Sequence, residues 1–139
     1  MYKNFNLQFF ISYFGLIPYL IIIIDKFFLN QIDINILHSF SVFYSIIILV
    51  FIGSINWNFE KQIPKILILY GFSPSLFSVF FIMLYLYDYN VFNLLISFFL
   101  IQLLLDYFLI YKNGNYLRVF FLVRAPLTTL IVFSLIIIQ

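Results

Sequence analysis

Long apolar stretches, broken only by short polar segments, run through almost the whole 139-residue chain. Five of them are long enough to form membrane-spanning helices: residues 9–29, 36–57, 66–87, 91–111 and 119–138. A helix rises about 1.5 Å per residue and a hydrocarbon core is about 30 Å thick, so about 20 apolar residues make one span. The apolar runs are continuous rather than alternating, which favours helices over strands. The pattern predicts an all-α integral membrane protein, a single compact bundle of five transmembrane helices over residues 1–139.

The composition supports this class, since 65% of the residues are hydrophobic and only 9% are charged, against about 45–50% and about 25% in soluble domains. A net charge of +2 is too small to indicate nucleic-acid binding. Because the chain has no cysteine, disulfides, thiolate metal sites and thiol catalysis are excluded. No phosphate-binding glycine loop, nucleophile elbow or metal-ligand spacing is present in the sequence. We therefore expect no enzyme activity, no cofactor, no metal and no small-molecule substrate.

A second feature of the composition concerns where the protein is made. Phe and Tyr number 21 and 11, whereas Gly and Pro number 4 each and Ala125 is the single alanine. This bias follows AT-rich codons, which are typical of mitochondrial genomes, reduced endosymbionts and some bacteria with small genomes. Met1 to Gln8 hold one lysine and no arginine, unlike an import presequence. We expect an organelle-encoded protein of the mitochondrial inner membrane, with a bacterial inner membrane as the alternative.

Positive charges alternate between the two sides of the predicted spans. Such charges accumulate on the side from which insertion starts. One side carries Lys3, Lys61, Lys65, Lys112 and Arg118, and the other carries only Lys26. This distribution predicts that the amino terminus lies in the matrix, or in the bacterial cytoplasm. Trp57, at the inner end of the second span, is expected to be an interface anchor in an aromatic belt.

Two charged residues are expected at bilayer depth, where a charge costs about 2.5–3.5 kcal/mol on insertion scales. Asp106 and Arg124 each lie six residues from the short loop 112–118. In an antiparallel hairpin both would lie about 9 Å from the same interface, which predicts a buried ion pair. Gln102 and Thr128, one turn further on, extend the two polar faces. A structural clasp is favoured over a proton or ion relay, because no second acid appears deeper in the membrane.

Small and polar residues form two stripes suited to helix packing. Gly71, Ser75 and Ser78 share one face of the third span, where another helix can approach closely. Pro74 is expected to bend that span together with Gly71, as Pro18 is expected to bend the first span. The second stripe, on the second span, consists of His38, Ser41 and Ser45. Lipid cannot hydrogen-bond these groups, so we expect protein partners for them.

The single histidine, His38, cannot supply both axial ligands of a haem. A packing or helix-capping role is favoured over a haem shared with a partner subunit, as in the membrane anchors of succinate dehydrogenase. The remaining acids, Asp25, Asp33, Glu60 and Asp88, are expected to be solvated in loops.

Four segments resemble the uncharacterised family that includes transmembrane protein 69, a presumed mitochondrial inner-membrane protein with bacterial relatives: Gly15–Pro18, Tyr44–Trp57, Gly71–Leu76 and Leu122–Leu135. The residues that match its motifs are Gly53, Trp57, Ser73, Pro74, Asp106, Arg124, Pro126, Leu127 and Thr128. The chain departs from the family at Asn56, where relatives often have histidine, and in its Ile and Phe at positions that are usually small. The resemblance implies a fold and a membrane, and it implies no established activity.

The leading hypothesis is a non-catalytic accessory subunit of a respiratory-chain complex, either cytochrome c oxidase or the membrane arm of NADH dehydrogenase. Its partners would be the other membrane subunits of that electron-transport complex and lipids. The alternatives are a divergent proton-conducting core subunit and a membrane anchor of succinate dehydrogenase. Tyr70–Leu84 is similar to a helix of the sixth membrane subunit of NADH dehydrogenase, and Arg124 could correspond to the essential arginine of ATP synthase subunit a. A small transporter is disfavoured, because the sequence has no inverted repeat.

Overall fold

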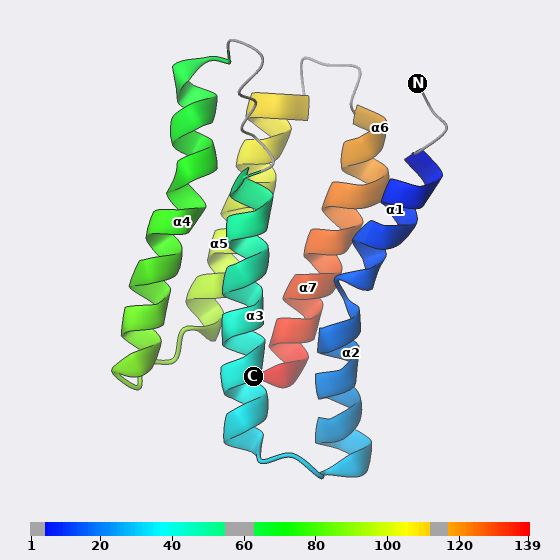
Figure 1. Ribbon diagram of the computed structural model, residues 1–139, viewed down its shortest axis with the longest axis vertical. Helices are drawn as coiled ribbons and strands as arrows, with labels where there is room; N and C mark the ends of the chain where they lie inside the picture. The colour runs from blue at the N-terminus through cyan, green and yellow to red at the C-terminus, as the bar shows by residue number, and fades with distance from the viewer. Residues whose placement is uncertain (1–4, 55–62, 112–116) are drawn as a thin grey trace. The chain divides into compact units, whose positions relative to one another are not determined.

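A computed structural model of the chain describes residues 5–54, 63–111 and 117–139 (Figure 1). Its helices are, in order, α1 Phe5–Phe14, α2 Ile17–Ile24, η1 Asp25–Leu29, α3 Ile34–Ser54, α4 Lys65–Leu86, α5 Phe92–Asp106, η2 Tyr107–Tyr111, α6 Leu117–Val119, η3 Phe120–Arg124 and α7 Ala125–Ile138. The three η segments are short pieces of π-helix, in which hydrogen bonds join residues five apart rather than four. Over the described ranges the chain is all-helical and contains no strand.

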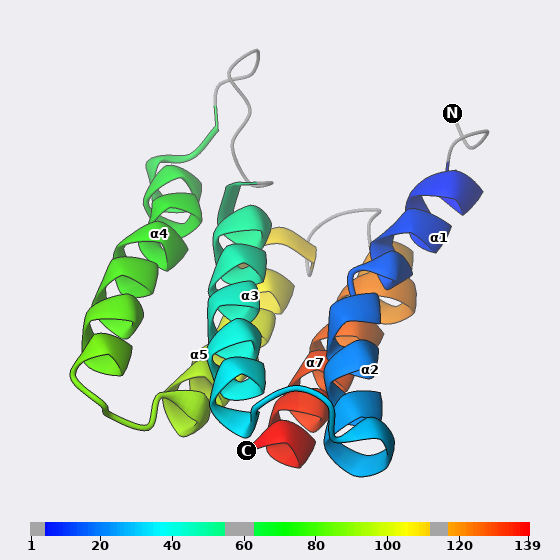
Figure 2. The ribbon, with the colours of Figure 1, turned by 60° about the horizontal axis from the view of Figure 1, so that its bottom comes forward.

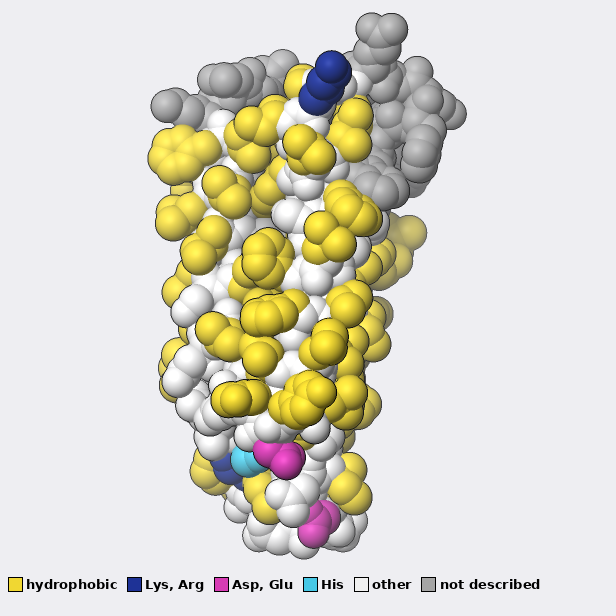
Figure 3. Space-filling model, turned by 90° about the vertical axis from the view of Figure 1, so that its left-hand side faces the viewer, with side chains coloured by type: hydrophobic (Ala, Val, Ile, Leu, Met, Phe, Trp, Pro, Cys, Tyr) yellow, Lys and Arg dark blue, Asp and Glu magenta, His cyan; other side chains and the backbone are white. Residues whose placement is uncertain are grey.

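Five of the described helices are long and apolar enough to cross a membrane: Phe10–Leu29, Ile34–Ser54, Lys65–Leu86, Phe92–Ile110 and Leu117–Ile138. They agree with the predicted spans to within a few residues, apart from the end of the second span, which lies outside the described residues. Large apolar side chains are exposed on them, including Phe28 at 79% and Leu69 at 69%. Figure 3 shows hydrophobic side chains over the middle of one face and charged side chains toward its ends. This surface suits lipid, and it indicates a membrane protein.

The chain is divided into two compact units. The first consists of Met1–Ser41 and Phe98–Gln139, and the second is Val42–Ser97. The boundaries fall inside α3 and α5, so each of these helices contributes residues to both units. A single bundle over residues 1–139 stays a prediction.

The first unit contains α1, α2, η1, the beginning of α3, the end of α5 and the helices from η2 to α7. The predicted bend at Pro18 is present, because α1 ends at Phe14 and α2 begins at Ile17 with the proline in its first turn. Proline is tolerated there, since the N–H that it lacks would have no helical partner. Beyond this break α2 packs on α7, as Figures 1 and 2 show. Buried residues of this unit include Tyr19, Ile22, Phe99, Leu135 and Ile138.

Within the second unit, α3 and α4 approach each other closely at one point. Gly53 of α3 lies against α4, and a Cβ atom at this position would be 2.7 Å from the carbonyl oxygen of Gly71 and 2.8 Å from Cγ of Pro74. Two helix backbones can approach this closely only where a side chain is missing. The predicted close approach at Gly71 is therefore present, and its partner is Gly53.

Pro74 lies inside α4, which continues without interruption from Lys65 to Leu86. Because proline has no N–H, the carbonyl four residues earlier, that of Tyr70, loses its helical donor. The Ser73 hydroxyl donates to this oxygen at 2.8 Å. The local sequence thus satisfies the backbone group that its own proline exposes.

Candidate functional site

An ion pair joins the two charged residues expected at bilayer depth. Asp106 is the last residue of α5 and Arg124 the last residue of η3, so each lies where an α-helix meets a π-helical segment. Arg124 Nε donates to Asp106 Oδ2, and the two side chains are 12% and 3% exposed. The structure therefore brings together the two residues whose matching depths predicted a pair. The pair neutralises both charges, which would lower the cost of placing them in a hydrocarbon region.

The π-helical segment η3 ends at Arg124 and is directly followed by Ala125 and Pro126. A proline ring inside a helix clashes with the carbonyl four residues earlier, here that of Leu122, and removes its hydrogen bond. The hydroxyl of Tyr13, from α1, donates to this Leu122 oxygen at 2.8 Å. A distant tyrosine thus replaces the donor that Pro126 lacks, and it ties α1 to the segment that carries Arg124.

Replacing Tyr13 by phenylalanine is expected to lower the stability of the first unit by about 1 kcal/mol, because the Leu122 carbonyl would lose this donor while the ring stays in place. The measurement is the melting temperature. Isolated membranes are heated, and the temperature at which half of the protein has aggregated is recorded. Tyr89→Phe, at an exposed tyrosine of the second unit, is the control and should melt as the unchanged protein does. A Tyr13→Phe chain that melts like the control would contradict a structural role for this bond.

The polar faces beside the ion pair are also buried. Gln102 is 2% exposed and lies one turn before Asp106 on α5, while Thr128 is fully buried one turn after Arg124 on α7. Two buried polar atoms of this cluster, Arg124 Nη2 and Thr128 Oγ1, have no hydrogen-bond partner among the residues that the structure describes. The cluster is therefore a polar site inside an apolar unit.

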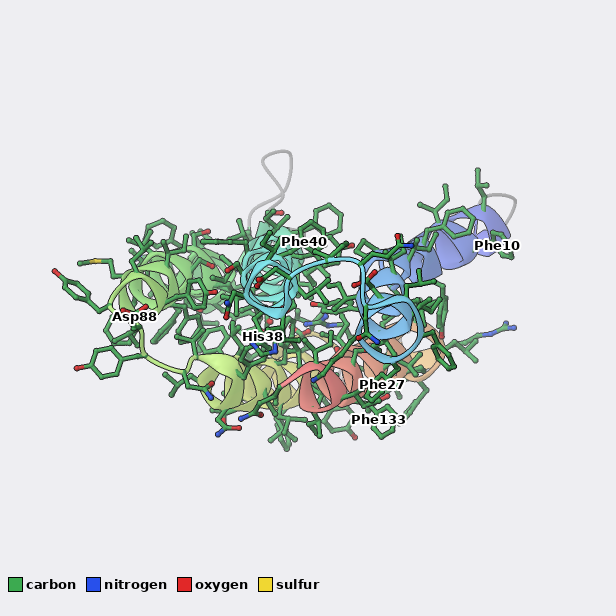
Figure 4. The ribbon with its side chains drawn as sticks, turned by 90° about the horizontal axis from the view of Figure 1, so that it is seen from below. Phe10, Phe27, His38, Phe40, Asp88 and Phe133 are labelled. Carbon is green, nitrogen blue, oxygen red and sulfur yellow. The ribbon has the colours of Figure 1, made fainter. Side chains whose placement is uncertain are left out.

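A second polar cluster lies at the opposite end of α7. Lys26 Nζ donates to the carbonyl oxygens of Ile137 and Ile138 at 3.1 and 2.7 Å. His38 Nε2 lies 3.0 Å from the same Ile138 oxygen, and because a carbonyl only accepts, Nε2 carries the proton. Figure 4 labels His38 on α3. Both residues bind the last carbonyls of a helix, where donors and positive charge are favourable.

Asp25 lies in a position that sequence reasoning missed, and the expectation of a solvated loop residue is wrong. It is 3% exposed and belongs to η1. Its carboxylate accepts the backbone N–H groups of Gln31 and Ile32 at 3.4 and 3.1 Å, and its carbonyl accepts the N–H of Asn30 at 2.7 Å. Asn30 has a left-handed conformation, with φ of 49°, which asparagine tolerates better than most residues. In the sequence, the spacing of five residues between Asp25 and Asn30 is the feature that could have indicated this helix end.

The two predicted packing stripes are largely buried. Ser41 and Ser45 are fully buried, Ser78 is 4% exposed, Gly71 and Pro74 are buried, and Ser75 and His38 are half-buried. The hydroxyls of Ser41 and Ser78 donate to carbonyls of their own helices, those of His38 and Pro74. These two hydroxyls therefore need no donor or acceptor from another chain. The predicted interface anchor, Trp57, and the acid Glu60 lie outside the described residues, and Asp33 and Asp88 are exposed as expected.

Residues able to coordinate a metal do not gather in the described part of the chain, where no group of three or more His, Cys, Asp or Glu side chains lies together. What the site offers is a neutralised charge pair with buried hydrogen-bonding groups around it.

These observations define an all-α protein with five helices of membrane-spanning length in its described ranges and a buried ion pair between two of them. Residues 6–139 match the model of DUF3429, described as a protein of unknown function, and the chain belongs to this family. No curated protein and no solved structure shows significant similarity to it.

Proposed function

We propose that the chain crosses the mitochondrial inner membrane, or alternatively a bacterial inner membrane, five times and serves there as a non-catalytic accessory subunit of a respiratory-chain complex. We further propose that this complex is cytochrome c oxidase or the membrane arm of NADH dehydrogenase. We also propose that the chain is related to the family of transmembrane protein 69. Its partners would be the other membrane subunits and lipids.

The non-catalytic role is supported by the contacts that the charged groups in the spans make. Asp25 accepts two backbone N–H groups, Lys26 donates to two carbonyls, and Asp106 pairs with Arg124. Each of these contacts closes a helix end or joins two helices. Charges inside a membrane usually mark a transport path or a catalytic site, but here they hold the first unit together.

The apolar surface supports a subunit that is embedded among lipids and other helices. On α1, Phe10 and Phe14 are 63% and 52% exposed, and on α7 Phe133 is 61% exposed. Figure 4 labels Phe10 and Phe133. The aromatic-rich composition of the chain also supports the proposed mitochondrial location, because it follows AT-rich codons, which are typical of mitochondrial genomes.

Separation of intact complexes from mildly solubilised native membranes, with mass spectrometry of each fraction, tests the proposal. We expect the chain to migrate with the subunits of cytochrome c oxidase or of NADH dehydrogenase and to leave that position when the complex is dissociated. Migration alone, near its own mass of 16.7 kDa plus bound detergent, would contradict the accessory role. Migration with ATP synthase would favour the proton-conducting alternative, as would migration with an NADH dehydrogenase that contains no other sixth membrane subunit.

The proposed orientation can be tested by cysteine labelling, because the chain contains no cysteine of its own. With the amino terminus in the matrix, Gln31→Cys and Tyr89→Cys should react with an impermeant maleimide added outside the inner membrane. Lys61→Cys and Lys112→Cys should react only after the membrane is permeabilised, since positively charged loops stay on the side from which insertion starts. The reverse pattern would overturn the orientation.

A further inference from the structure

The hydroxyl of Thr128 differs from three other hydroxyls in the described helices. Ser78, Ser134 and Thr129 donate to carbonyls three or four residues earlier in their own helices, at 2.6, 2.8 and 2.8 Å. This local bond is the usual solution for serine and threonine in an apolar helix. Thr128 is fully buried, yet its Oγ1 has no partner among the described residues. Leaving a buried hydroxyl unbonded is costly, so a partner of another kind is expected.

Arg124 has a second buried group in the same condition. Its Nε bonds to Asp106, whereas its Nη2 is buried and finds no acceptor within the described ranges. Arg124 lies at the start of α7 and Thr128 four residues later, so both side chains lie on one face of this helix. The unused Nη2 and the unused hydroxyl therefore belong to one local site.

The chemistry of these two groups defines the ligand. A guanidinium nitrogen only donates, so the ligand must present an acceptor, and a hydroxyl can donate to that same acceptor. Asp106 already neutralises the charge of Arg124, which disfavours a second anion in an apolar surrounding. A neutral oxygen satisfies all three conditions.

We propose that Arg124 Nη2 and Thr128 Oγ1 form a binding site for one neutral oxygen acceptor, which is either a water molecule or the carbonyl oxygen of a lipid. The site rests on the geometry of the first unit and is independent of which complex hosts the chain. Asp106 takes no part in binding the oxygen. It holds the guanidinium in place, so it is a positioning residue.

Solid-state NMR on the full chain in lipid vesicles tests the site. Labelling with ¹⁵N-arginine gives only two side chains, because Arg118 and Arg124 are the only arginines, and Arg118→Lys assigns the signals. Magnetisation transfer from water to the Arg124 Nη2 protons would identify water as the source of the oxygen. Dephasing of the Nη2 signal by vesicles made of lipid with ¹³C-labelled carbonyls would identify lipid. If neither contact is detected at Arg124, the site does not exist.

A pair of variants at Thr128 tests its share in the site. Thr128→Val keeps the shape but removes the hydroxyl, and the oxygen contact at Nη2 should weaken about fivefold, the effect of losing one hydrogen bond. Thr128→Ser keeps the hydroxyl and should retain the contact. The Nε signal, which reports the pair with Asp106, should stay unchanged in both variants and shows that the fold is intact. An Nη2 contact that is equally strong in the valine and serine variants would overturn the role of Thr128.

Discussion

Replacing Arg124 by leucine should destabilise the first unit by about 3–5 kcal/mol, the largest effect that we expect from any single substitution in this chain. The physical reason is that the buried side chain of Asp106 would remain buried without its partner or would have to bind a proton. The protein should then melt at a clearly lower temperature in isolated membranes and accumulate to a lower level. Arg118→Leu removes the same side chain at an exposed position and is the matched control, with an expected change below about 1 kcal/mol.

A double variant separates the clasp from a relay. If the pair only joins two helices, Asp106→Leu combined with Arg124→Leu should recover most of the lost stability, because no charge is left buried and apolar packing replaces the ion pair. If the chain belongs to a respiratory complex as proposed, the activity of that complex should recover as well. A double variant that is stable but leaves the complex inactive would contradict the clasp and would favour proton transfer through Asp106 and Arg124.

Gly53→Ala should destabilise the second unit by about 1–3 kcal/mol, as overpacking of a close helix contact does. Alanine is intrinsically better than glycine in a helix by about 1 kcal/mol, so the sign depends on the space available. The added Cβ would meet the Gly71 carbonyl oxygen at 2.7 Å, and this backbone atom cannot turn away as a flexible side chain could. The contact should therefore outweigh the gain in helix propensity.

The measurement is again the melting temperature of the chain in isolated membranes. Ser54→Ala also creates an alanine, at the next, exposed position of α3, but it adds no Cβ and removes only a hydroxyl that donates to the Phe51 carbonyl of its own helix, so it should change the melting temperature little. Equal melting of the two alanine variants would show that α3 and α4 can separate at Gly53 without cost.

The sequence was sufficient to predict the five apolar helices, because their length and continuity follow from the thickness of a bilayer. The pairing of Asp106 with Arg124 was also accessible, since a short loop fixes the relative depth of two antiparallel helices. Their position at the ends of an α-helix and a π-helix could not be predicted, because a π-helical segment depends on a single register shift rather than on a repeating pattern.

Long-range capping contacts were the other feature that sequence reasoning missed. Lys26 and His38 bind carbonyls about a hundred residues away, and a backbone carbonyl carries no mark in the sequence. Asp25 was misplaced for a related reason. A charged residue next to Lys26 at the end of an apolar run resembles the start of a loop, although this one continues as a helix and caps its own end.

The division of the chain into two units has a consequence for biogenesis. The second unit is one continuous segment, Val42–Ser97, and its internal packing can form before Phe98–Gln139 is synthesised. The first unit combines both ends of the chain. The bonds that Tyr13, Lys26 and His38 make can form only after their acceptors have been synthesised. These acceptors are the carbonyl oxygens of Leu122, Ile137 and Ile138. Interactions between such distant residues form late. Until η3 and α7 are synthesised, α1, η1 and α3 lack these acceptors. A chain that stalls before its last helix should therefore be a substrate for quality control.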